Sequence, residues 1–290
     1  MGLPQAHRAV LRALLVPIAC TAACMPVRAQ QRVEVPRADG VHTPLRVYWP
    51  TGGGCSRLAV ISPGAGGTEN GYAYLARGLA DRGWLAIVMG HRESGPGTLV
   101  RQVSSSGLHG GLKKMVTDPT EQRDRIHDLD AALAWSAPRC PGAYKALLGH
   151  SMGSDTVMFE AGALNRLEVH GGDRFDAYVA VSPTGEGAIF AAHAWKRIEK
   201  PMYVLTGTRD AGLEGAWQWR TQPFEDLPPG CVWLGVIDDA THLNFAGIGL
   251  AAKTEKLTLT SVAAFLAAAQ ARDCSAPPGE PGITLRSRAR

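Results

Sequence analysis

Short apolar runs alternate with stretches of helical spacing along most of this chain. The apolar runs are rich in Val and Ile, and each is short enough to form one buried strand. We predict strands at 43–49, 58–61, 85–89, 146–148, 177–181, 202–205 and 232–237. Apolar residues between these runs recur with the period of a helix, which predicts helices at 72–82, 120–135, 152–167, 213–224 and 254–271.

This order is typical of an α/β protein with a mostly parallel central sheet of about eight strands and helices on both faces. No internal repeat or second domain emerges, so we expect a single domain over residues 30–274 and a flexible tail over 275–290. Segment 90–119 has scattered Gly, Ser and Pro, which indicates a long loop. Because it follows a strand at the ligand-binding end of such sheets, it either borders a cleft or is a plain surface loop.

Residues 1–29 differ from the rest of the chain. Basic residues precede an apolar run, and Val27-Arg28-Ala29 fits a cleavage site, so we expect a signal peptide and a secreted or periplasmic protein. The run is roughly 15 residues long and contains prolines, which makes it too short for a stable membrane span. Cys24 leaves a lipoprotein as the less favoured alternative, because a large aliphatic residue is missing three positions earlier.

Composition and charge narrow the function. The formal charge is +4, and removing residues 1–29, which hold three arginines and no acid, gives 4 − 3 = +1. A nearly neutral mature protein has no electrostatic footprint for nucleic acid. With 45% hydrophobic and 19% charged residues, the chain also has the balance of a globular protein and not of a disordered one.

Four cysteines remain in the mature chain, an even number that suits an oxidising compartment. Cys55 and Cys140 each precede a strand, and we expect these strands to lie side by side. Cys231 precedes the last predicted strand, and Cys274 ends the last helix. We therefore expect disulfides Cys55–Cys140 and Cys231–Cys274, with four free buried thiols as the alternative. The chain has no C-x-x-C or H-x-x-x-H pairing, so we expect no metal.

The sharpest motif is Gly149-His150-Ser151-Met152-Gly153. It lies between a predicted strand and a predicted helix, which is the setting that a G-x-S-x-G nucleophile turn requires. The flanking glycines let the backbone turn tightly and lift the Ser151 hydroxyl into the open. An ordinary glycine-rich turn between strand and helix is the alternative interpretation.

A serine hydroxyl needs a base and an acid that orients the base. His242 follows the last predicted strand and Asp210 follows an earlier one, which gives the chain order serine, acid, histidine. Asp238 and Asp239 are rival acids, but they lie on the same loop as His242. We predict Ser151 as nucleophile, His242 as base and Asp210 as acid.

The reaction also needs hydrogen-bond donors for a developing oxyanion. The backbone N–H of Met152 follows the nucleophile and is one candidate. The second should come from Pro63-Gly64-Ala65-Gly66-Gly67, with Ala65 as first choice and Gly66 as second. A phosphate-binding loop is excluded here, because no Lys-Ser/Thr follows the glycines.

Together, the glycine loop, the turn at Ser151, Asp210 and His242 look like the α/β-hydrolase superfamily, over about residues 32–271. Pro63-Gly64-Ala65-Gly66-Gly67, Gly71-Tyr72-Ala73-Tyr74-Leu75-Ala76 and Gly83-Trp84 resemble predicted dienelactone hydrolases and secreted, cutinase-like polyester hydrolases. Two departures matter. Dienelactone hydrolase proper has a cysteine nucleophile, and many relatives have His-Gly where this chain has Pro63-Gly64.

The resemblance implies the α/β-hydrolase fold and hydrolysis of a small or polymeric carboxylic ester, with no cofactor. An acyltransferase or peptidase with the same triad, and a non-catalytic binding protein of the same fold, are the alternatives. Gly64, Gly66, Trp217 and Phe245 are candidate substrate contacts, although core packing is the plainer interpretation of the two aromatic residues.

Overall fold

The computed structural model describes residues 1–2, 30–275 and 279–289. The expected signal peptide therefore lies almost entirely outside the described residues. Within them, a nine-stranded sheet forms the centre of the protein in the order β1-β2-β4-β3-β5-β6-β7-β8-β9. The strands are β1 Gln31–Pro36, β2 His42–Tyr48, β3 Arg57–Ser62, β4 Leu85–Met89, β5 Tyr144–His150, β6 Ala177–Val181, β7 Met202–Arg209, β8 Val232–Thr241 and β9 Ile283–Ser287.

Strands β4, β3, β5, β6, β7 and β8 run parallel, and antiparallel pairs close both edges. All residues of β4 and β6 are buried, as expected for parallel strands covered on both faces. The predicted α/β class and mostly parallel sheet are confirmed. All seven predicted strands are present, and β1 and β9 extend the sheet beyond them.

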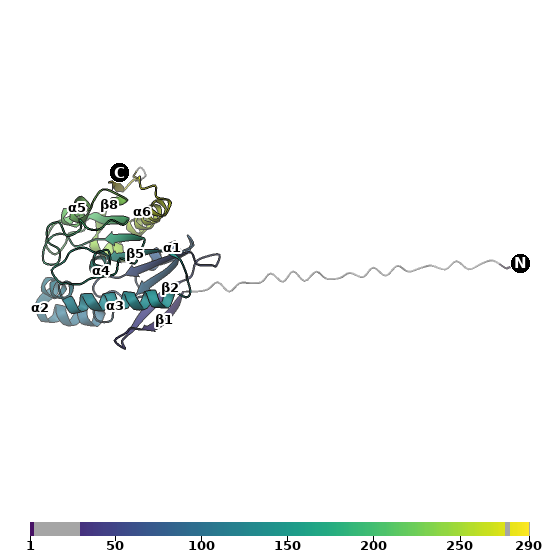
Figure 1. Cartoon of the computed structure of the whole chain (residues 1–290), viewed down its shortest axis with the longest axis horizontal. Coiled ribbons are helices and arrows are strands. Elements are labelled where there is room, and N and C mark those ends of the chain that lie inside the picture. The colour runs from purple at the N-terminus through teal and green to yellow at the C-terminus, as the bar shows by residue number, and fades with distance from the viewer. Residues whose placement is uncertain (3–29, 276–278, 290) are drawn as a thin grey trace.

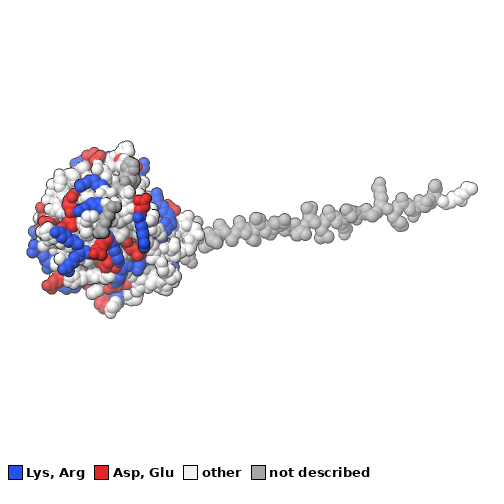
Figure 2. Space-filling view, turned by 45° about the horizontal axis from the view of Figure 1, so that its top comes forward, with Lys and Arg blue, Asp and Glu red and all other residues white. Residues whose placement is uncertain are grey.

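Helices cover both faces of the sheet (Figure 1). Apolar residues of α3 (Pro119–Ser136) and α4 (Met152–Glu160) pack in one core, and those of α1 (Ala73–Ala80) and α6 (Ala252–Ala271) pack in the other. None of the helices in the described part of the chain is long and apolar enough to cross a membrane. Figure 2 shows Lys and Arg side chains interspersed with Asp and Glu over the face in view.

Segment 90–119, expected as a loop, instead contains α2 (Pro96–Val116). Gly107 interrupts this helix with non-helical angles, φ 70° and ψ 170°. A Cβ on Gly111 would collide with the backbone of Gln102 and Val103, so the two halves of α2 lie against each other as a helical hairpin. The glycines that indicated a loop thus provide the turn and the close contact of this hairpin.

Three other expectations were wrong. Residues 275–290 are not simply a loose tail, because β9 pairs antiparallel with β8 from Trp233↔Ser287 to Ile237↔Ile283. The helix expected over 213–224 is mostly irregular, and only η1 (Trp217–Thr221, a 3₁₀ helix) and α5 (Gln222–Asp226) form there. In addition, α4 ends at Glu160 rather than near Leu167.

The four cysteines form the favoured pairs. Cys55–Cys140 joins the segments that precede β3 and β5, and these strands are neighbours in the sheet. Cys231–Cys274 joins the start of β8 to the segment after α6. The Cα atoms of each pair lie 5.0 Å apart.

Candidate active site

A sharp turn between β5 and α4 holds Ser151. Its φ is 55°, a backbone conformation that residues other than glycine rarely adopt. A Cβ on Gly149 would collide with the carbonyl oxygen of Gly153, and a Cβ on Gly153 would collide with that of Ser62. Both glycines are therefore required for the turn, which leaves the Ser151 side chain facing a pocket.

A continuous hydrogen-bonded chain links Ser151, His242 and Asp210. His242 lies in η2 (His242–Ala246, a 3₁₀ helix) directly after β8, and Asp210 directly follows β7. The Nε2 atom of His242 lies 2.9 Å from Ser151 Oγ, and its Nδ1 atom lies 2.8 Å from Asp210 Oδ1. The rival acids Asp238 and Asp239 are exposed on β8, and His242 pairs with neither of them.

Two further side chains hold the buried Asp210 carboxylate. Thr206 donates to Oδ2 over 3.0 Å, and the Arg220 Nε atom lies 2.9 Å from Oδ1. Arg220 also donates to the carbonyl oxygens of Ser182, at 2.7 Å, and Ala211, at 3.1 Å. Burial lowers the pKa of Arg220, whereas the Asp210 carboxylate opposes that shift. Sequence reasoning missed this role, because Arg220 lay inside a predicted helix and belongs to no motif.

The glycine loop after β3 leaves one backbone donor free. The N–H groups of Gly64, Gly66 and Gly67 have acceptors at 3.3, 2.8 and 3.0 Å. The N–H of Ala65 has no acceptor among the described residues, and Ala65 lines the same pocket as Ser151. Met152 also lines the pocket and is the first residue of α4, where backbone N–H groups lack helical acceptors.

Arg125, on α3, lies beneath this loop and is fully buried. It donates to the Pro63 carbonyl oxygen and to three hydroxyls: Ser62 at 3.0 Å, Ser94 at 2.7 Å and Thr156 at 3.0 Å. One guanidinium thus joins the end of β3, the segment before α2, and α4. Sequence reasoning missed this residue, because a lone arginine on a helix carries no motif.

A second Ser–His–Asp arrangement lies in the interior. Ser62 Oγ is 2.9 Å from His91 Nε2, and His91 Nδ1 is 2.8 Å from Asp128 Oδ2. All three residues are buried, at 0%, 2% and 1% exposure, and Ser62 Oγ also accepts from Arg125. Burial, followed by the charge of Arg125, lowers the pKa of His91 to about 4. None of the three residues lines the pocket that contains Ser151.

His150, inside the serine turn, faces Tyr72. Its Nδ1 atom lies 2.7 Å from the Tyr72 hydroxyl, and its ring centroid lies 4.6 Å from that of His242. Burial, followed by the nearby His242, lowers the pKa of His150 well below the ordinary value. A neutral His150 therefore packs beside His242, without a hydrogen bond to Ser151.

The pocket around Ser151 has a volume of about 680 Å³. Eight large aliphatic side chains line it, and α2 contributes several of them. These aliphatic residues are Leu99, Leu108, Leu112, Val116, Ile189, Leu213, Leu243 and Ile248. Lys113 and Glu214 form an ion pair of 3.4 Å within the lining. The pocket therefore favours an apolar ligand with its polar group at Ser151.

The expected substrate contacts are only partly in this pocket. Gly64 and Gly66 line it. Trp217 is not part of its lining, and the neighbouring Trp219 is. Phe245 is fully buried and packs against His150, with ring centroids 6.1 Å apart. The structure therefore places Trp217 and Phe245 outside the pocket lining, and η1 rather than a regular helix decides which tryptophan faces the pocket.

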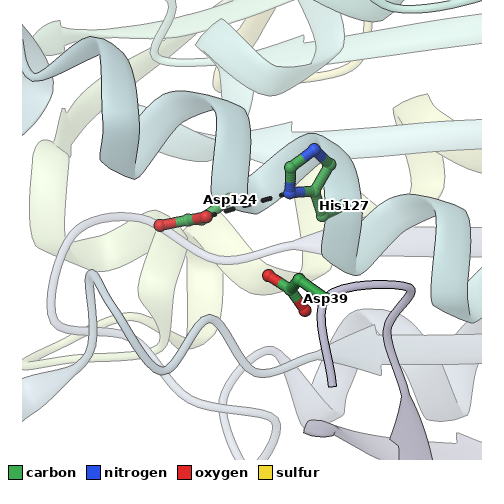
Figure 3. Close-up of side chains that lie close together, drawn as sticks. All are labelled: Asp39, Asp124 and His127. Carbon is green, nitrogen blue, oxygen red and sulfur yellow. Dashed lines mark ion pairs between the residues drawn. The ribbon is translucent and has the colours of Figure 1, made fainter. Parts of the chain in front are cut away.

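One side-chain cluster has the composition of a metal site. Figure 3 shows the side chains of Asp39, Asp124 and His127 close together. They offer ligand atoms within 4.8 Å of one another. Arg37, however, donates to both carboxylates, and its hydrogen bond lowers the pKa of Asp39 to about 2. The guanidinium already balances the acidic charge, so we assign no metal to this cluster.

No protein-family model and no curated protein matches the chain. Among solved structures, it is similar to a cold-adapted esterase from an Arctic intertidal metagenomic library, with a TM-score of 0.55 and 18% identity over 83% of this chain and 92% of that one. It is also similar to the esterase domain of a Rhodothermus marinus protein, with a TM-score of 0.55 and 13% identity over 83% and 98%. At these identities the likeness establishes the fold alone, an α/β fold with a mostly parallel nine-stranded sheet.

Proposed function

We propose that this chain is a serine hydrolase that cleaves carboxylic esters through an acyl-enzyme. The observation that carries the proposal is the hydrogen-bonded chain Ser151–His242–Asp210, whose serine opens onto an apolar pocket. The interior arrangement of Ser62, His91 and Asp128 has similar distances but does not line the pocket, so access distinguishes the two.

In the first step, Ser151 Oγ attacks the ester carbonyl carbon while His242 Nε2 takes the hydroxyl proton. The resulting imidazolium is stabilised by Asp210, whose carboxylate is fixed by Thr206 and Arg220. The carbonyl oxygen becomes an oxyanion, which accepts hydrogen bonds from the Ala65 and Met152 N–H groups. When the bond to the alcohol breaks, His242 returns the proton to the leaving oxygen.

In the second step, water attacks the acyl-enzyme with His242 again as base. The same donors stabilise the second oxyanion, and the proton on His242 returns to Ser151 Oγ as the acid leaves. The unengaged N–H of Ala65 supports this assignment, because the neighbouring N–H groups of the loop already have acceptors.

The aliphatic lining supports an ester with an apolar acyl or alcohol group, and the two similar structures are of an esterase and an esterase domain. The protein acts outside the cytoplasm in this proposal, because its two disulfides persist in oxidising compartments.

Two matched serine variants test this function with p-nitrophenyl butyrate. Ser151→Ala should lower kcat by about 10⁶-fold, because removing such a nucleophile leaves only binding and oxyanion stabilisation. Ser62→Ala removes the same atom from the interior arrangement and should keep kcat within about tenfold of wild type. Retained turnover in folded Ser151→Ala, or equal losses in both variants, would refute the assignment.

A further inference from the structure

Exposed apolar side chains gather around the mouth of the pocket. Leu108, Leu243 and Ile248 line the pocket, yet 66%, 54% and 53% of their surfaces are exposed. Leu250 follows Ile248 closely along the chain and is 99% exposed. We call these four residues the rim. Soluble proteins rarely group large apolar side chains in this way unless the surface binds something.

The two segments that carry the rim contain no acidic residue, although Glu255 of α6 approaches Gly247. Residues 94–117, which include α2, contain no Asp or Glu, and residues 242–252 contain no Asp, Glu, Lys or Arg. Arg101 and Lys114 are exposed on α2. Arg101 donates to Thr98 and its charge acts on the Glu121 carboxyl, but neither Arg101 nor Lys114 has a carboxylate within 4.0 Å among the described residues. The acid of the pocket lining, Glu214, is already paired with Lys113. Apolar side chains beside unpaired cations are complementary to an anionic lipid surface.

We propose that the rim docks on the surface of an anionic lipid bilayer, with Arg101 and Lys114 of α2 facing the lipid headgroups. The rim side chains enter the boundary between headgroups and acyl chains, as in other interfacial proteins. The pocket mouth then opens toward the lipid, so an ester-bearing lipid can reach Ser151 without crossing water. This last consequence rests on the proposed function, whereas docking itself does not.

An anionic lipid surface explains both the exposed apolar rim and the cations on α2. An uncharged polymer would account for the rim but not for the unpaired Arg101 and Lys114. The membrane is contacted from one side only, in agreement with the absence of a spanning helix in the described part of the chain.

Vesicle binding tests docking separately from catalysis. We would measure co-sedimentation of the Ser151→Ala protein with two kinds of vesicle. One contains phosphatidylcholine alone, and the other also contains about 30% of the anionic lipid phosphatidylglycerol. Leu250→Gln removes one rim side chain, and Leu164→Gln is the matched control. Leu164 is also an exposed leucine, at 45%, but it follows the C-terminal end of α4, and Ser151 directly precedes the other end of this helix.

We expect binding to the anionic vesicles and a partition coefficient lowered about tenfold by Leu250→Gln, which is the scale of burying one leucine. Lys114→Gln should lower it about fivefold, as expected for one cation near such a surface. Leu164→Gln should bind like the parent. Absence of vesicle binding, equal binding to both compositions, or equal losses in the two leucine variants would overturn the proposal, with melting temperatures verifying the fold of each variant. Vesicle binding by a protein that lacks esterase activity would refute the proposed function and leave docking intact.

Discussion

Asp155 provides a measurable pH dependence of stability. It lies on α4 one turn after Ser151 and is fully buried. Neither of its side-chain oxygens has a hydrogen bond of normal geometry among the described residues, although Thr184 lies near enough to favour the charged form weakly. Burial therefore dominates and raises the pKa of this carboxyl from 3.8 to about 7.

This raised pKa makes the folded protein less stable as the pH rises. Because the folded-state pKa lies above the unfolded value, the contribution of Asp155 to stability is complete below pH 3.8 and is lost as the pH rises through about 7. The rise from 3.8 to about 7 corresponds to about 4 kcal/mol at 1.36 kcal/mol per pH unit. Asp155→Asn keeps the shape of the neutral side chain and cannot ionise.

Urea denaturation of the oxidised protein at several pH values between 4 and 8 measures this effect. We expect similar unfolding free energies for Asp155→Asn and wild type near pH 4, and a variant more stable by up to about 4 kcal/mol at pH 8. Asp238→Asn is the matched control, since Asp238 is exposed. A difference between Asp155→Asn and wild type that is constant with pH would show that Asp155 stays ionised throughout the range.

Three more predictions concern the triad, the loop beneath it and the disulfides. Asp210→Asn should lower kcat by about 10⁴-fold, because it favours the wrong tautomer of His242, whereas Asp238→Asn should turn over normally in the same steady-state assay. Arg125→Lys cannot bond all the groups that the guanidinium joins, so kcat should fall about 10- to 100-fold with little change in KM, and an unchanged kcat would show that Arg125 does not position the Ala65 loop. Replacing Cys231 and Cys274 by Ser opens a loop with a sequence separation of 43 and should cost about 4 kcal/mol in urea denaturation, and the Cys55 and Cys140 pair, separated by 85, should cost slightly more. A loss below about 1 kcal/mol in either pair would contradict the loop-closure argument.

The sequence predicted the central strands well, because a strand buried on both faces needs a continuous apolar run. Prediction from the sequence failed at the edges of the sheet. Strand β9 has only Ile283 buried, and a Pro- and Gly-rich segment precedes it, so pairing with β8 leaves little periodic signal. The prediction also failed at α2, where Gly107 turns the chain between two helical halves and Gly111 lets those halves pack closely.

Some residues of the candidate site could be predicted from the sequence, and others could not. Ser151, His242 and Asp210 follow strands at one end of the sheet, so chain order alone suggested that they would meet, and the structure brings them together. Arg220 and Arg125 act through contacts between segments distant in sequence, and no local motif predicts such contacts.

Labelling with a fluorophosphonate probe, followed by peptide mapping, tests the central claim most directly. The reagent modifies a serine only where a base activates it and solvent reaches it. We predict one label per chain, on Ser151, with labelling abolished in Ser151→Ala and retained in Ser62→Ala. A label on any other residue, or a folded wild-type protein that takes no label, would contradict this prediction.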